Sequence, residues 1–140
     1  RLSSVYGDQL DHRTRVLPAF VIAALSDQPL RVDDPAGILD FTRASEVAVG
    51  LLRYAELLAA GQSISPIHFV SGIGTCLANL AELVIQLANS ESDFKAGEPR
   101  NYDVARFIGD PSKARTLLGW HSSTPLTQGI QELLRTFRDS

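Results

Sequence analysis

The sequence is poor in the residues that build covalent or metal-bound sites. It has a single cysteine, Cys76, which excludes both an intramolecular disulfide and a cysteine-based zinc cluster. Its apolar neighbours Leu77, Leu80 and Val84 favour a buried small hydrophobe over a nucleophile. The three histidines have no partner at metal-ligand spacing, and no Gly-x-Ser-x-Gly elbow marks a serine nucleophile. The residues alone therefore name no catalytic group, and we expect no metal site.

The chain also lacks a basic excess and a long apolar run. Its 13 Lys and Arg residues are outnumbered by 16 Asp and Glu residues, which argues against a nucleic-acid-binding surface, although one anionic small molecule can still bind. No apolar stretch is long enough to cross a bilayer and no signal peptide is evident, so we expect no membrane partner and a cytoplasmic location. The remaining composition, 44% hydrophobic in 140 residues, is that of one ordinary globular domain.

Hydrophobic periodicity predicts about five helices that alternate with short strands, and therefore an α/β fold. The helices are expected to start after Thr14, after Ser45 as an N-cap, after Thr75 as an N-cap, after Asp110 and after Thr124. Extended segments are expected at residues 29–32, 38–42, 66–70 and 104–108, and a polar surface loop is expected at residues 90–102.

Residues 1–7 have the pattern of a buried strand that runs into a loop. Leu2 and Val5 are apolar, Tyr6 is a good strand former, and Gly7 ends the run. A strand of this kind needs neighbouring strands, and we expect them to lie upstream of this chain.

Two turns could be taken for functional sites. The turn Gly72-Ile73-Gly74 resembles the phosphate-binding turn of dinucleotide sites, but Leu77 stands at the third glycine position, which favours a tight turn. The adjacent acids Asp33 and Asp34 precede a proline and a glycine, and this context favours a solvated turn over a catalytic carboxylate pair.

Arg100 and Asp103 form the best polar cluster of the sequence. A guanidinium grips phosphate in a fork and a carboxylate accepts hydrogen bonds from ribose hydroxyls, so the pair could bind a nucleotide sugar. On spacing alone, a solvent-exposed ion pair is the favoured alternative.

The order of six segments is more informative than any one of them. These are Arg-Leu-Ser-Ser-Val-Tyr-Gly at 1–7, Arg-Val-Leu-Pro at 15–18, Asp-Phe at 40–41, Phe-Val-Ser-Gly-Ile-Gly-Thr at 69–75, the segment 100–103, and Gly-Asp-Pro-Ser-Lys-Ala at 109–114 with Leu-Gly-Trp at 118–120. Together they resemble the C-terminal half of extended short-chain dehydrogenases of the NAD-dependent epimerase/dehydratase family, which includes the nucleotide-sugar 4-epimerases. The resemblance covers essentially all 140 residues.

The resemblance implies that residues 1–140 are a C-terminal substrate-binding region whose N-terminal Rossmann core, the part that holds NAD or NADP, is absent. The expected partners are a nucleotide-sugar substrate and that Rossmann domain, and the family allows a homodimer. The family's catalytic Tyr-x-x-x-Lys pair is missing, because neither Lys95 nor Lys113 has a tyrosine four residues before it. We therefore expect no catalytic residue, no bound cofactor and no activity from this chain alone, whether the complete protein is an epimerase, a dehydratase or a reductase.

Site residues carry over one position at a time. Arg100 and Asp103 match the family's Arg-x-x-Asp contact to the nucleotide diphosphate and ribose. Arg15 falls where the family places a polar residue near the substrate, and Ser4 stands in the position of a common substrate-binding asparagine. Ser3 lies at the edge where cofactor and sugar would meet, which makes it a candidate cofactor contact.

Leu39 is the main departure from the family pattern. The family usually has a phosphate-binding arginine immediately before the Asp-Phe pair, whereas leucine offers no donor. Three explanations are open: another substrate, a rearranged phosphate clamp that uses Arg43 or Arg31, or a degenerate homologue that serves as a noncatalytic binding or interaction module. A self-contained small fold that only echoes the motifs is a further alternative, and it predicts that the opening strand leaves no bare apolar face.

Overall fold

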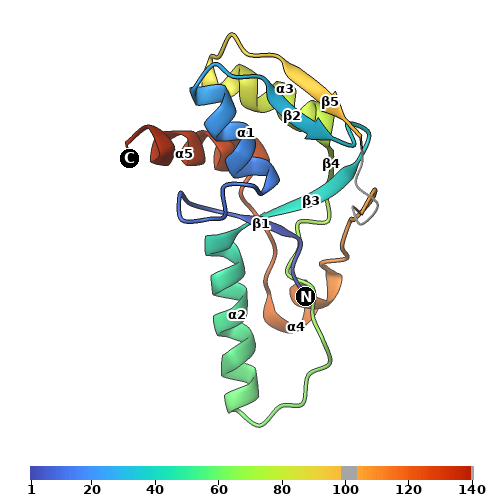
Figure 1. The fold of residues 1–140 in the computed structure, drawn as a ribbon. Coiled ribbons are helices and arrows are strands. Elements are labelled where there is room, and N and C mark those ends of the chain that lie inside the picture. The colour runs from blue at the N-terminus through green and yellow to red at the C-terminus, as the bar shows by residue number, and fades with distance from the viewer. Residues whose placement is uncertain (99–103, 140) are drawn as a thin grey trace.

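The computed structural model describes residues 1–98 and 104–139. These residues form five helices and five short strands (Figure 1). In chain order they are β1 (Ser4–Tyr6), α1 (Val16–Leu25), β2 (Leu30–Asp33), β3 (Ile38–Arg43), α2 (Ala44–Ala59), β4 (Gly74–Cys76), α3 (Leu77–Ala88), β5 (Phe94–Gly97), α4 (Ser112–Leu118) and α5 (Leu126–Arg138). The α/β class and the expectation of about five helices with short strands are confirmed.

The strands form two small sheets. In the first, with the order β1-β3-β4, β1 runs parallel to β3 and β4 runs antiparallel to it. In the second, β2 runs parallel to β5. The opening strand therefore has a neighbour within the chain, with Ser4 opposite Phe41, and Leu2 forms an isolated bridge with Phe69. The expectation that its neighbours lie upstream is wrong for this edge, because residues 38–43 occupy it.

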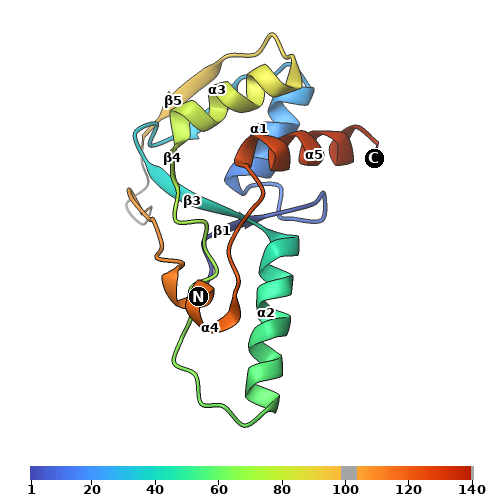
Figure 2. The ribbon, with the colours of Figure 1, turned by 180° about the vertical axis from the view of Figure 1, so that it is seen from behind.

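The core lies where three helices gather against these sheets. Figures 1 and 2 show α1, α3 and α5 together at one end of the molecule, while α2 extends away from them beside α4. The helices α1 and α5 each bury one apolar face there, and they supply fully buried side chains including Leu17, Val21, Ile130, Leu133 and Leu134. Each such side chain contributes on the order of 1.5–3 kcal/mol relative to an exposed one.

A second, smaller apolar cluster supports the extended part of the molecule. Val47, Ile67, Phe69, Ala114 and Trp120 are all buried there, and the rings of Phe69 and Trp120 meet edge to face with centroids 5.1 Å apart. The cluster holds the first turns of α2 against α4 and the segment 66–70. That segment was expected to be a strand. Ile67, Phe69 and Val70 are buried, but within the described residues the segment makes a single bridge, at Phe69.

Glu46 joins the start of α2 to the segment that leads into α5. Its carboxylate accepts hydrogen bonds from the Ser122 hydroxyl and from the backbone N–H and hydroxyl groups of Ser123 and Thr124, at 2.7–3.0 Å. Burial alone would raise the pKa of Glu46, but the hydrogen bonds from Ser123, Ser122 and Thr124 outweigh it and lower the pKa below its usual 4.5. The carboxylate therefore stays charged in the folded protein.

Two helix starts differ from expectation. The second helix begins at Ala44, so Ser45 lies inside its first turn and does not cap it. The third begins at Leu77, because Thr75 lies in β4 and pairs with Leu39 on the neighbouring strand. Backbone pairing with a strand remote in sequence has overridden the local capping signal in this case.

The polar segment 90–102 was expected to be a surface loop, and this expectation is wrong for part of it. Residues 94–97 form β5, which pairs with β2 from Leu30↔Phe94 to Asp33↔Gly97. Phe94 packs against the main core, which anchors the strand despite its polar surroundings. The later residues of the segment lie outside the described part of the chain.

Candidate functional site

Asp40 organises the glycine turn that follows the segment 66–70. This aspartate is fully buried in β3. Its Oδ1 accepts hydrogen bonds from the Ser71 N–H at 2.9 Å and from the Ser71 hydroxyl at 2.7 Å, and its Oδ2 accepts from the N–H groups of Gly72 at 2.8 Å and Gly109 at 3.3 Å. These amides are the donors that a bound phosphate would need at this turn. The geometry therefore agrees with a structural turn and leaves no dinucleotide cradle there.

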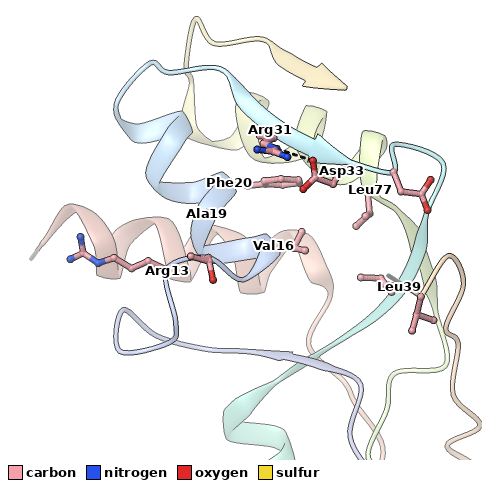
Figure 3. Close-up of a pocket in the computed structure, with 11 residues that line it drawn as sticks. Arg13, Val16, Ala19, Phe20, Arg31, Asp33, Leu39 and Leu77 are labelled. Carbon is pink, nitrogen blue, oxygen red and sulfur yellow. Dashed lines mark hydrogen bonds and ion pairs between the residues drawn. The ribbon is translucent and has the colours of Figure 1, made fainter. Parts of the chain in front are cut away.

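The main cavity, of about 590 Å³, opens between α1, β2 and β3 (Figure 3). Leu39 and Leu77 form an apolar wall, while Arg31 and Asp33 lie at the polar part of the cavity. The remaining lining residues come from the loop before α1, the helix itself, the turn after β2 and the segment after residue 103: Arg13, Thr14, Val16, Ala19, Phe20, Asp34 and Val104. The volume is within the range of small-molecule sites.

A second cavity, of about 310 Å³, lies on the other side of the start of α1. It brings together Ser4 and Arg15, two residues that the sequence singled out as substrate contacts. The exposed guanidinium of Arg15 lies 3.4 Å from the Asp11 carboxylate, which also lines this cavity. Because both cavities are lined by Thr14 and by the first residue of α1, they are neighbours at the N-terminal end of that helix.

The other predicted site residues have different settings. Ser3 is half-buried and its hydroxyl lies 2.7 Å from that of Thr42, so it lines neither of these two cavities. Arg100 and Asp103 lie outside the described residues. On one side of this segment Gly97 pairs with Asp33, a residue of the main cavity, and on the other side Val104 lines the cavity itself.

Arg43 and Arg31, the two candidates to replace the donor missing at Leu39, have different settings in the structure. Arg43 forms an ion pair with Glu132 of α5 and lines neither cavity. Arg31 lines the main cavity, and its Nε donates to Asp33 Oδ1 at 2.8 Å. The interpretation of Asp33 and Asp34 as a solvated turn did not anticipate that Asp33 pairs with Arg31 in the lining of the main cavity. The strand period of two, which places Arg31 and Asp33 on one face, was the signal for it.

Two further observations concern metals and membranes. Within residues 1–98 and 104–139, no group of three or more His, Cys, Asp or Glu side chains is placed to hold a metal ion. In the same part of the chain, no helix combines the length and apolarity needed to cross a bilayer.

Comparison by sequence finds relatives among enzymes of nucleotide sugars. No family model matches the chain. UDP-glucuronic acid decarboxylase 3 of Arabidopsis thaliana is 29% identical over 140 residues, which is 99% of this chain but 40% of that protein. The chain thus spans less than half the length of this relative.

Comparison by structure leads to the same group of enzymes. The UDP-glucose 4-epimerase of Thermotoga maritima, solved with UDP-glucose, superposes with a TM-score of 0.86 at 24% identity over 99% of this chain and 45% of its own. The UDP-glucose 4-epimerase of Thermus thermophilus, solved with NAD, gives 0.84 at 22% identity over 100% and 46%. The chain is thus similar in sequence to nucleotide-sugar decarboxylases and epimerases, and it has the fold of the C-terminal part of solved NAD-dependent epimerases.

Proposed function

We propose that residues 1–140 are the substrate-binding region of an NAD(P)-dependent enzyme that epimerises, dehydrates, decarboxylates or reduces a nucleotide sugar. The observation that carries this proposal is the pair of adjoining cavities at the start of α1. The smaller cavity contains Ser4 and Arg15. The larger one is lined by Val104, which follows the segment 99–103, and by Asp33, the strand partner of Gly97 shortly before that segment.

The two cavities suit the two halves of such a ligand. The smaller one presents the Ser4 hydroxyl and the Arg15 guanidinium, groups that can hydrogen-bond to sugar hydroxyls. The larger one has room for the nucleoside and diphosphate, which Arg100 and Asp103 would bind through phosphate oxygens and ribose hydroxyls. In this assignment the sugar points toward β1 and toward Ser3, where the cofactor of the complete protein would meet it.

The cofactor itself requires another domain. The amides of Ser71 and Gly72 are already bonded to Asp40, so this glycine turn does not fit a dinucleotide phosphate. The solved relative from Thermus thermophilus carries NAD in a chain of which this fold is about half. We accordingly assign NAD or NADP to an N-terminal Rossmann domain, and we expect this chain alone to bind neither and to be inactive.

The exposed apolar surface supports a missing neighbour domain. Leu51 is 48% exposed and Leu52 is 66% exposed on the outward side of α2, and Leu2 is 49% exposed beside the opening strand. A Rossmann domain of the same protein could cover these side chains. A homodimer and a cytoplasmic location stay predictions.

Leu39 supports a second candidate function. It lines the main cavity at the position where the family resemblance implies an arginine, and it offers no donor to a phosphate. A noncatalytic binding or interaction module that has lost its clamp would show this substitution. The two candidates differ in whether the complete protein binds a nucleotide sugar at all.

The proposal is tested by substituting Arg100 in the complete protein. Arg100→Ala should weaken the affinity for a UDP sugar at least about tenfold, because hydrogen bonds to a charged phosphate typically contribute 1.5–3 kcal/mol. The matched control is Arg115→Ala, which removes an exposed arginine from α4, away from both cavities. Equal affinities of the wild type and Arg100→Ala for several nucleotide sugars would refute the assigned site.

A further inference from the structure

The main cavity has an unequal distribution of donors. Among its described lining residues, Arg13 and Arg31 carry positive charge, while Leu39 and Leu77 present only carbon atoms. A phosphate placed against the leucines would lose water without gaining a hydrogen bond, which is costly. An anionic ligand in this cavity must therefore turn its charge toward a guanidinium.

Arg31 is held ready for such a contact. Its Nε donates to Asp33 Oδ1 at 2.8 Å, and both side chains project from the same side of β2, whereas Leu30 and Val32, which alternate with them along the strand, are buried. No hydrogen bond from the two terminal amino groups of Arg31 is found within the described residues, and its side chain is 77% exposed. These groups are thus available for a forked contact with two phosphate oxygens. Because Asp33 fixes the side chain, less conformational entropy is lost on binding.

Arg13 and Arg43 are less suited to this contact with a diphosphate. Figure 3 shows the side chain of Arg13 extending away from Leu39 and Leu77. Arg43 is engaged with Glu132 and lies outside the cavity lining.

We propose that Arg31, oriented by Asp33, binds the diphosphate of the ligand and replaces the donor that Leu39 does not provide. This assignment rests on the proposed function, because it concerns the same ligand in the same cavity. It places the diphosphate at the β2 side of the cavity and leaves the leucine wall to apolar parts of the ligand.

The test compares UDP with uridine, which differ by the diphosphate, in calorimetric titrations of the complete protein. Arg31→Gln should weaken UDP binding at least about tenfold and leave uridine affinity within about twofold. The matched control Arg13→Gln makes the same chemical change in the same cavity and should change UDP affinity by less than about threefold. Thermal unfolding of each variant shows whether the fold is retained.

In Arg31→Gln the Asp33 carboxylate is left unpaired, and its charge could repel phosphate. A double variant that also neutralises Asp33 separates this repulsion from the loss of the arginine. Arg31→Gln with Asp33→Asn should stay at least about tenfold weaker than the wild type for UDP. Recovery of wild-type affinity in the double variant, or UDP affinity within about twofold in Arg31→Gln, would overturn the role of Arg31 while leaving the proposed function intact. A wild-type protein that binds neither UDP nor any UDP sugar would overturn the proposed function and this assignment with it.

Discussion

Asp40 holds Ser71 through two hydrogen bonds to one carboxylate oxygen, from the backbone N–H at 2.9 Å and from the hydroxyl at 2.7 Å. Its other oxygen binds Gly72 and Gly109, so a single buried side chain on β3 joins three segments of the chain. Leu39, which forms part of the wall of the main cavity, immediately precedes Asp40.

Asp40→Asn should destabilise the protein by about 2–4 kcal/mol. Either orientation of the new amide turns an N–H₂ group toward a backbone N–H, so two buried donors face each other and an acceptor is lost. Urea unfolding measures the effect through the midpoint. The control Ser71→Ala removes the hydroxyl but keeps the hydrogen bond from the backbone N–H of residue 71 to Asp40, and it should cost about 1 kcal/mol. An unchanged midpoint for Asp40→Asn would contradict this role.

The stability of the protein should depend on pH through Glu46. The folded-state pKa of this carboxyl lies below its ordinary 4.5, because hydrogen bonds from Ser123, Ser122 and Thr124 outweigh the opposing effect of burial. A lowered folded pKa means that the stabilisation is fully present above pH 4.5 and is lost as the pH falls through the folded pKa.

Glu46→Gln should remove this part of the acid dependence and cost about 1 kcal/mol at pH 7, which is less than the ~1.5–3 kcal/mol of a buried charged hydrogen bond because solvent screens this partly exposed group. Unfolding free energies of the wild type and the variant, measured from pH 7 to pH 3, should converge at low pH. Glu82→Gln, an exposed change on α3, serves as the control and should run parallel to the wild type. Curves for Glu46→Gln that also stay parallel would disprove the assignment.

Gly129 allows α5 to pack directly on the opening strand. A Cβ at this position would overlap the ring and hydroxyl of the buried Tyr6. Gly129→Ala should therefore destabilise the protein by about 2–3 kcal/mol through overpacking. Gly61→Ala is the comparison, because φ is +78° there but no atom lies within 4 Å, so the cost should be the backbone strain alone, about 1 kcal/mol. Equal costs for the two variants would show that the contact with Tyr6 is not the limiting one.

Arg43→Gln should have little effect on ligand binding. Its guanidinium is paired with Glu132 at partly exposed positions, so the loss should cost no more than about 1 kcal/mol of stability. UDP affinity of the complete protein should stay within about twofold of the wild type. A tenfold loss would point to Arg43 as part of the phosphate clamp.

The parts of the fold that depend on local pattern could be predicted from the sequence. Helices were expected to start after Asp110 and after Thr124, and α4 begins at Ser112 and α5 at Leu126. The strand at residues 94–97 could not be predicted, because its backbone partner is β2, more than sixty residues earlier in the chain. The same holds for β4, whose pairing with β3 removed Thr75 from the helix cap.

The candidate site, too, was predictable only where a local pattern or the family resemblance pointed to it. Ser4 and Arg15 were selected through the family resemblance, and the structure brings them into one cavity. The role of Asp40 at the glycine turn had no local signal, because Ser71, Gly72 and Gly109 lie 31 to 69 residues away in sequence. Arg31 did have a local signal, because the alternation along β2 places it on the same face as Asp33. Asp33 and Asp34 were instead interpreted as a solvated turn.

The central claim is that the complete protein binds a nucleotide sugar in these cavities. Calorimetric titration of UDP-glucose, UDP-glucuronic acid and dTDP-glucose into the complete protein with NAD bound tests it most directly. We predict saturable heat at one site per chain for at least one of these ligands, with Arg100→Ala reducing the affinity at least about tenfold. The absence of heat with all three ligands would contradict the account and favour a noncatalytic module.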